Sequence, residues 1–142
     1  MKFKIVTPER IMVETEADSL TLPTTMGEIT VLPHHIPLVA SLVAGEISYK
    51  HGGKSDFFAV SGGIIEVKKN NEVVVLADTA EFGHEIDVER AEAAKEAARK
   101  LMTEGARDQK TYAGAAAVFQ KHLTRLKVAH KHRSHKGTKI NG

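Results

Sequence analysis

The chain has 142 residues and a formal net charge of +2, which is enough for one ordinary domain or for a small domain with an appendage. It contains no cysteine, so disulfide bonds and thiolate chemistry are excluded, and it has no apolar run long enough to span a membrane as a helix. Residues 1–86 carry 7 Lys and Arg against 12 Asp and Glu, whereas residues 87–142 carry 13 against 6, which predicts a basic interaction arm in the second part.

The first part of the chain reads as a series of short strands separated by turn residues. Pro33 and Pro37 remove amide donors, so the connection between them is expected to be extended and not helical. Strands that recur about every ten residues predict an all-β sandwich or a flattened barrel. Alternating polar and apolar residues predict these strands over Lys2–Val6, Arg10–Leu22, Met26–Leu32, Leu38–Val43, Glu46–His51 and Lys54–Val60.

The strongest β signal is the stretch 57–78, in which two largely apolar runs flank a polar turn. The runs at residues 64–67 and 73–76 predict a β-hairpin. Because apolar residues follow one another directly in both runs, both faces of this hairpin are expected to be covered. Gly62 and Gly63, just before it, allow the chain to bend or two backbones to approach closely.

After Thr79 the apolar period changes from that of a strand to that of a helix. Asp87 is placed to cap a helix that begins at Val88, and a second helix follows a turn at residues 105–108, which predicts an antiparallel helical hairpin. An alanine-rich seam buries little area at about 25 cal/mol per Å², so this hairpin is expected to open readily. The seam positions are Ala91, Ala94, Ala98, Leu101 and Gly105 in the first helix and Tyr112, Ala116, Phe119, Leu123 and Leu126 in the second.

The predicted organisation is therefore α+β, with a β-sandwich over residues 1–85, a two-helix hairpin over residues 86–130 and a basic, disordered tail over residues 131–142. The tail histidines, which are His130, His132 and His135, have no carboxylate beside them, so no metal site is predicted there. The histidines between the two prolines, His34 and His35, are expected to pack within a loop.

Motifs for catalysis are absent from the sequence. There is no Ser/His/Asp grouping, no P-loop and no G-x-G-x-x-G, and the glycine pairs lie between strands without a helix N-terminus behind them to hold phosphate. The chain is not expected to be an enzyme or to require a cofactor. From the residues alone, the basic arm can be a solvated surface, a nucleic-acid-binding segment or a docking surface for an acidic protein.

Two segments carry a resemblance to a known family. They are residues 57–78, which contain Phe-Phe-Ala-Val-Ser-Gly-Gly-Ile-Ile-Glu-Val, and residues 32–38, which read Leu-Pro-His-His-Ile-Pro-Leu. Through them, residues 2–128 resemble the epsilon subunit of F-type ATP synthases, the small subunit at the base of the rotating central stalk. The family usually has glycine where this chain has His34, so a positive φ there is expected to be harder to adopt.

The resemblance implies a sandwich that binds the gamma subunit and the ring of c subunits. It also implies a hairpin that either folds against the sandwich or extends along gamma toward the alpha and beta subunits, where it impedes ATP hydrolysis. Catalysis then lies on alpha and beta, and this chain couples and regulates at the cytoplasmic face of the bacterial cell membrane, touching the membrane only through the complex. The implied partner contacts are His35, Arg107, Lys110, Lys121, Arg125 and Lys127. The alternative is a free-standing nucleic-acid-binding module, which would not co-purify with gamma.

Residues 86–91 read Ile-Asp-Val-Glu-Arg-Ala and match the pattern with which some bacterial members of this family bind ATP as a regulatory ligand. The simpler interpretation is a helix start in which Asp87 is the cap and Arg90 is solvated, and the two interpretations are compatible. Ala97 stands where the resemblance implies an arginine, so weak ATP binding is expected. The site would use Glu81, Ile86, Asp87, Arg90, Ala91 and Arg125.

Overall fold

The computed structural model describes residues 1–105 and 108–141, the last eight by their backbone alone. The chain divides into two compact units, Met1–Phe82 and Gly83–Gly142. The division lies three residues before the boundary predicted at residue 85.

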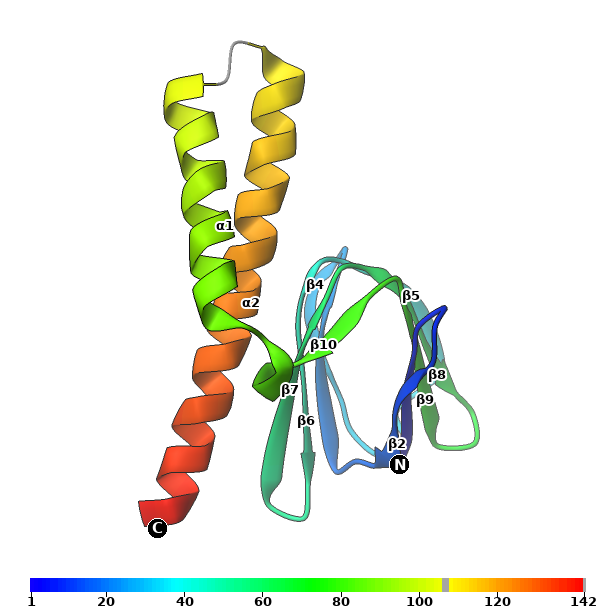
Figure 1. The fold of residues 1–142 in the computed structure, drawn as a ribbon. Coiled ribbons are helices and arrows are strands. Elements are labelled where there is room, and N and C mark those ends of the chain that lie inside the picture. Colours follow the sequence, from blue (N-terminus) through cyan, green and yellow to red (C-terminus); the bar gives the residue numbers. More distant parts are fainter. Residues whose placement is uncertain (106–107, 142) are drawn as a thin grey trace. The chain divides into compact units, whose positions relative to one another are not determined.

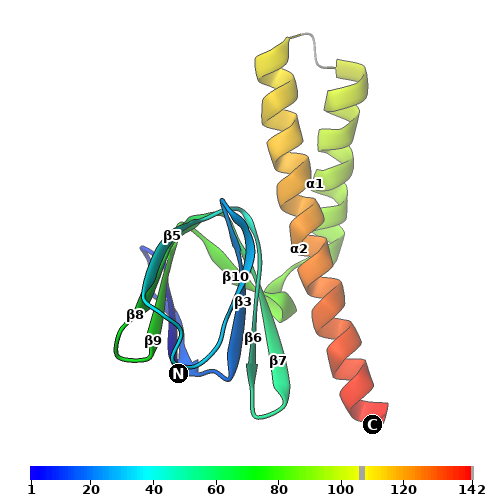
Figure 2. The same ribbon diagram turned by 180° about the vertical axis from the view of Figure 1, so that it is seen from behind.

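The first unit is a β-sandwich of ten strands in two layers (Figure 1). The sheet order is β10-β7-β6-β3-β5-β8-β9-β1-β2, with β4 paired to β3. The two layers join where β3 pairs with β5 through Thr24 and Leu42, which makes a nearly closed, flattened barrel (Figure 2). The strands are β1 (Lys2–Val6), β2 (Ile11–Glu16), β3 (Ser19–Thr24), β4 (Gly27–Val31), β5 (Leu38–Leu42), β6 (Gly45–His51), β7 (Lys54–Val60), β8 (Gly63–Lys68), β9 (Glu72–Ala77) and β10 (Ala80–Phe82).

Two strand boundaries differ from the sequence prediction. The region predicted as one strand over residues 10–22 is divided at Ala17 and Asp18 into β2 and β3. The other difference is an additional strand, β10, which the change to a helical period after Thr79 does not predict. It is three residues long and its pairing partner, β7, is distant in sequence, so its local signal is weak.

The core of the sandwich lies between the two layers. Ile5 and Val75, which are partners in the parallel pair of β1 and β9, are fully buried. Aromatic rings continue this core: Tyr49 stands 5.2 Å from Phe3 and 5.8 Å from Phe58, measured between ring centres. Burial and the neighbouring Asp56 carboxylate raise the pKa of Tyr49 to about 12, so this ring stays neutral at physiological pH.

The outer face of the hairpin formed by β8 and β9 is exposed, which corrects the prediction that both of its faces are covered. Ile65 and Val75 point into the core and are fully buried. Their neighbours Ile64 and Leu76 point outward and are 49% and 52% exposed. Successive residues of a strand face opposite sides, so an apolar run can equally mean a covered face or an exposed docking face.

Gly62 and Gly63 do what the sequence predicted. Both have positive φ, 132° and 141°. A Cβ on Gly63 would lie 2.0 Å from the carbonyl oxygen of Leu76. A side chain at residue 63 is therefore excluded by the backbone of the neighbouring strand.

The second unit is an antiparallel helical hairpin, as predicted. It consists of a 3-10 helix η1 (Gly83–Glu85), α1 (Val88–Lys100), a π-helical turn η2 (Leu101–Gly105) and α2 (Gln109–Asn141). Asp108 begins α2 by accepting the amide hydrogen of Thr111 at 2.7 Å, and its hydrogen bonds with Thr111 lower the pKa of its carboxyl. This cap explains why α2 begins at Gln109.

The seam of the hairpin differs in part from the predicted one. Ala91 and Ala98 of α1 are buried as expected, but Leu101 is 42% exposed. In α2 Leu126 is buried as predicted and Ala116, Phe119 and Leu123 are half-buried, whereas Tyr112 is exposed. Ala115, Val128 and Ala129 are buried in addition. Alanine-rich helices offer several apolar stripes at spacings of three and four, so the sequence does not fix which of the neighbouring apolar residues are most deeply buried.

The tail predicted to lack regular structure from residue 131 continues α2 to Asn141. Lysine, arginine and histidine are compatible with a helix, and the first glycine after residue 130 is Gly137. Local composition therefore does not stop α2 at residue 130. His132 is half-buried on this helix. The prediction of disorder therefore fails at least as far as His132, whose side chain packs against η1.

Candidate interaction surfaces and nucleotide site

One row of apolar side chains crosses four adjacent strands on the outer face of the sandwich. Ile64 pairs with Leu76, Leu76 with Val6, and Val6 with Ile11, so β8, β9, β1 and β2 each contribute one residue. Ile11 is 53% exposed, and Val6 is half-buried. We call these four residues the apolar row.

The row of residues next to the apolar row, counted along the strands, is more polar. The next row alternates Val39, Glu66, Val74, Lys4 and Glu14 in register. Together with Ile64 and Leu76, its first three members line a shallow groove of about 210 Å³. This face therefore has an apolar centre and a charged margin, which is the composition of a protein-binding surface.

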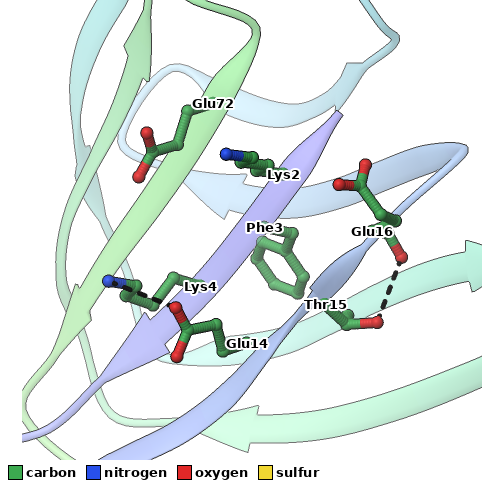
Figure 3. A pocket seen from close by; sticks show the side chains of 7 residues that line it. All are labelled: Lys2, Phe3, Lys4, Glu14, Thr15, Glu16 and Glu72. Carbon is green, nitrogen blue, oxygen red and sulfur yellow. Dashed lines mark hydrogen bonds and ion pairs between the residues drawn. The ribbon is translucent and has the colours of Figure 1, made fainter.

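The charged margin is a hollow of about 270 Å³ lined by side chains of β1, β2 and β9 (Figure 3). Lys4 lies 3.8 Å from Glu14, joining Nζ to Oε1, and Lys2 stands between Glu16 and Glu72 in register. The lining carries two lysines and three glutamates, so positive and negative side chains stand side by side and no cluster of one sign forms. It serves as a polar rim and not as a ligand site.

The loop over residues 32–37 is held in place by the turn between β8 and β9. The amide of His34 donates to Oδ1 of Asn71 at 2.7 Å, and the amide of His35 donates to the carbonyl of Leu32 at 3.1 Å. His34 adopts a positive φ of 65°, so histidine does take the conformation that was expected to be harder for it than for glycine. The hydrogen bond from the His34 amide to Asn71 helps to hold the backbone of His34 in this strained conformation.

This loop presents apolar residues to solvent beside the predicted partner contact His35. Leu32 and Ile36 are 56% and 75% exposed. His35 is half-buried and its Nδ1 donates to the carbonyl of Ile36 at 2.7 Å, which leaves Nε2 as the ring's other polar atom. The loop is thus a second exposed apolar surface with a fixed backbone.

The start of α1 has the geometry of a helix cap. Oδ1 of Asp87 accepts the amide hydrogen of Arg90 at 3.1 Å, and the backbone of Asp87 is extended. Ile86 and Ala91 are buried, while Arg90 is exposed. This confirms the simpler interpretation of residues 86–91, and it leaves the Arg90 side chain available on the surface.

The cationic residues predicted for ATP share one face of the hairpin. Arg90 precedes Ala94 and Ala97 by four and seven residues, and on α2 Lys121 and Arg125 follow Val118 by three and seven, so each continues the stripe of its helix. Counting from the connection, Arg125 lies 17 residues after Asp108 and Arg90 lies 15 before Gly105, a difference of two residues or about 3 Å along a helix. Arg125 also contacts His122, with 3.0 Å between Nη1 and Nδ1.

The middle of this face is an apolar groove of about 510 Å³. Ala97, which stands where an arginine was expected, forms part of its wall. The groove therefore lacks the cation that would grip a polyphosphate. Its lining is Ala94, Ala97, Ala98 and Leu101 from α1 and Thr111, Gly114, Ala115 and Val118 from α2.

The remaining predicted residues are placed as follows. Glu81 lies in β10 of the first unit and is half-buried. Lys110, Lys121 and Lys127 are exposed on α2. Arg107 lies outside the described residues.

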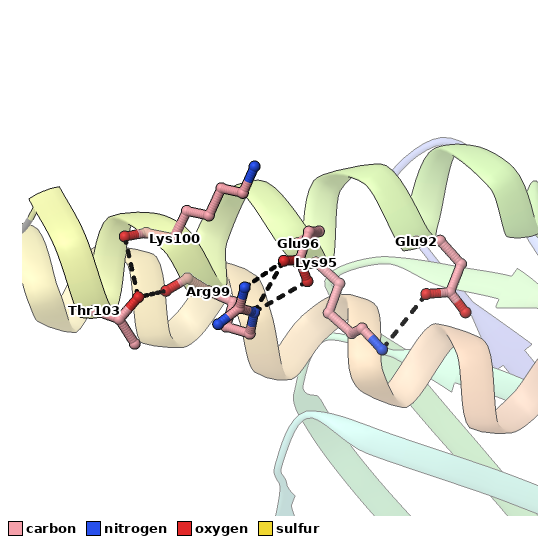
Figure 4. A network of polar contacts seen from close by, with 6 residues as sticks. All are labelled: Glu92, Lys95, Glu96, Arg99, Lys100 and Thr103. Atoms are coloured by element: carbon pink, nitrogen blue, oxygen red, sulfur yellow. Dashed lines mark hydrogen bonds and ion pairs between the residues drawn. The ribbon is translucent and has the colours of Figure 1, made fainter.

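A second polar surface follows α1 away from the seam (Figure 4). Lys95 pairs with Glu92 at 3.5 Å, and Nε of Arg99 lies 3.0 Å from both carboxylate oxygens of Glu96. The hydrogen bonds from Arg99 lower the pKa of Glu96. These i,i+3 pairs lie on the surface of α1, where solvent screens them, and each cation is already paired with a carboxylate of the same helix.

Metal ligands and membrane-spanning helices are two further features that bear on function. No group of three or more histidine or acidic side chains there could hold a metal ion. None of the helices, over the same residues, is long and apolar enough to cross a membrane. The exposed row, the loop and the cationic face are thus the surfaces that the fold offers.

Comparison with known proteins gives matches along nearly the whole chain. A family model for the β-sandwich domain of the ATP synthase delta/epsilon chain matches residues 1–83, and one for its long α-helix domain matches residues 84–130. The ATP synthase epsilon chain of Dehalococcoides mccartyi is 42% identical over 135 residues, covering 95% of this chain and 96% of the relative. That of Desulforamulus reducens is 41% identical over 128 residues, covering 90% and 96%.

Among solved structures, a chain of the Euglena gracilis mitochondrial ATP synthase, in a structure of its OSCP, F1 and c-ring, is similar in fold. The TM-score is 0.77 at 24% identity, covering 86% of this chain and 76% of that one. A chain from the central stalk and c-ring of the Tetrahymena thermophila mitochondrial ATP synthase has a TM-score of 0.58 at 12% identity, covering 90% and 95%.

Proposed function

The chain belongs to the delta/epsilon chain family of ATP synthases, and we propose that it is a non-catalytic central-stalk subunit that couples the catalytic head to the c-ring. The observation that carries this proposal is the apolar row. An exposed apolar centre with a charged margin on a rigid sheet fits a permanent partner, and the gamma subunit is the partner we propose for it. The complex would hold the chain at the cytoplasmic face of the bacterial membrane.

The loop over residues 32–37 is the surface we propose for the c-ring. Its exposed Leu32 and Ile36 flank His35, and Asn71 fixes the backbone between them. A rigid loop loses little conformational entropy on binding, which favours a tight contact.

The apolar row makes the proposal testable through Leu76. Leu76→Asp places a charge at an exposed position of the row, so the sandwich should fold but bind the gamma subunit at least 100-fold more weakly, as expected when a central interface residue is replaced by a charge. Co-purification and titration of the full chain with gamma measure this. His51→Glu, at the exposed tip of the β6–β7 hairpin, is the control and should bind as the parent does. Equal binding by the Leu76 variant would remove the row from the interface.

For the basic arm we propose contacts to acidic surfaces of the alpha and beta subunits when the hairpin is extended. Lys110, Lys121, Arg125 and Lys127 would supply these contacts, together with Arg107. Exposed charge pairs are screened by salt, so inhibition of hydrolysis by the arm should weaken as ionic strength rises.

We further propose weak, regulatory ATP binding on the face that carries Arg90, Lys121 and Arg125, with Ile86, Asp87 and Ala91 as the remaining contacts from the helical unit. We expect this binding to be weak because Ala97, in the wall of the groove, supplies no positive charge to the phosphates. Ala97→Arg should tighten ATP binding at least tenfold by adding a charge-assisted contact, and Arg90→Ala should abolish it. Calorimetric titration of the full chain measures both, and Lys110→Ala, near the tip of the hairpin, is the control. Parent-like affinity in the Arg90 variant would reduce residues 86–91 to a helix cap.

A further inference from the structure

A pair of histidines joins the two ends of the helical unit. His84 of η1 and His132 of α2 are 48 residues apart in sequence, yet their ring centres are 5.6 Å apart with the rings inclined at 49°. Both belong to the unit Gly83–Gly142. The hairpin therefore brings two imidazoles together from segments that the sequence alone does not connect.

The close approach depends on Gly83. A Cβ at this position would lie 3.0 Å from Cβ of His132 and 3.2 Å from the carbonyl oxygen of Val128. Val128 is fully buried, which fixes this turn of α2 against η1. The pair thus sits on an ordered scaffold, as metal sites in proteins usually do.

The spacing of the rings is compatible with one shared metal ion. Zinc binds an imidazole nitrogen at about 2.0–2.1 Å, and a ring nitrogen lies roughly 1.1 Å from the ring centre, so two rings on one ion have centres no more than about 6.4 Å apart. The observed 5.6 Å is within that limit.

The charges around the pair determine which ion it can take and how tightly. Oε1 of Glu85 lies 3.9 Å from Nε2 of His84, which places a carboxylate beside the His84 ring. Lys131 and Arg133 flank His132 but are exposed. Imidazole ligands select zinc, copper or nickel over magnesium or calcium, and two protein ligands completed by water give a weaker site than the four ligands of a structural zinc.

We propose that His84 and His132 form a two-histidine site for a divalent transition metal such as Zn²⁺, with Glu85 as the neighbouring carboxylate. The ion clips η1 to the C-terminal part of α2. Closing this 48-residue loop favours the antiparallel hairpin over any state in which the two segments separate. Metal binding would thereby hold the helical unit in the form seen here.

The test uses the full chain and Zn²⁺ alone as the probe. Calorimetry should give one ion per chain, and Zn²⁺ should slow amide hydrogen exchange in α2 around Val128. His84→Phe keeps a ring of similar size without nitrogen and should weaken binding at least tenfold. The control is His130→Phe, which removes an exposed histidine two residues from His132 and should change the affinity less than twofold.

Three outcomes would overturn the proposal. One is parent-like Zn²⁺ binding by the His84 variant, which would place the ion on tail histidines alone. Another is the absence of binding at millimolar Zn²⁺. The third is dimerisation by Zn²⁺ in sedimentation, which would show the histidines bridging two chains instead of one hairpin.

Discussion

Val75→Asp is expected to unfold the β-sandwich. Val75 is fully buried between its partners Ile5 and Ile65 on the neighbouring strands. An aspartate there brings a carboxyl group into an apolar core without a partner, at a cost of about 4 kcal/mol or more, and a unit of this size has only roughly 4–12 kcal/mol of stability. Urea denaturation followed by circular dichroism should show a large loss of stability or no folded state.

The neighbouring Leu76→Asp is the matched control for this prediction. It adds the same side chain to the same strand, but on the outer face, where Leu76 is 52% exposed. Its stability should remain within about 1 kcal/mol of the parent. A Val75 variant as stable as the Leu76 variant would mean that the two faces of β9 have been assigned the wrong way round.

The loss in Val75→Asp should also depend on pH in a known direction. Burial raises the pKa of a carboxyl group above its value in the unfolded chain. The charged form is therefore penalised in the folded state, and the stability deficit should shrink as the pH falls below the raised folded pKa, since the group then enters the core protonated.

Gly63→Ala is expected to damage the sandwich almost as severely. The added Cβ would lie 2.0 Å from the carbonyl oxygen of Leu76 and 3.0 Å from Cα of Ala77, and both belong to the backbone of β9. Neither can move aside without breaking the pairing of Gly63 with Ala77. Strain at a φ of 141° adds to the clash, so we expect a loss of about 3 kcal/mol or more.

Gly114→Ala is the matched control for the glycine change. No heavy atom lies within 4 Å of a Cβ built on Gly114 of α2. Alanine is the better helix former, so this variant should be neutral or more stable by about 0.5–1 kcal/mol. Thermal unfolding of the two variants beside the parent measures the contrast, and a tolerated Gly63→Ala would show that β8 and β9 are further apart than described.

Features whose signal is local were predictable from the sequence. The turn at residues 68–71 with apolar residues on both sides gave the hairpin of β8 and β9, and Asp87 followed by a helical period gave the start of α1. The family resemblance, carried by residues 32–38 and 57–78, is confirmed by the family models. Caps and turns depend on a few neighbouring residues, so their physics is complete within a short window.

The tertiary structure alone decided which faces of the strands and helices are buried and which elements pair with one another. Ile64 and Ile65 look alike in the sequence, and only strand pairing makes the first an exposed residue and the second part of the core. β10 exists because β7 offers it a pairing edge, and α2 buries Ala115, Val128 and Ala129 beside its predicted seam because an alanine-rich helix has no single preferred stripe. His84 meets His132 only after the hairpin has closed. Periodicity fixes which residues share a face, but burial of that face is a property of its partner, and the partner lies elsewhere in the chain or in another chain.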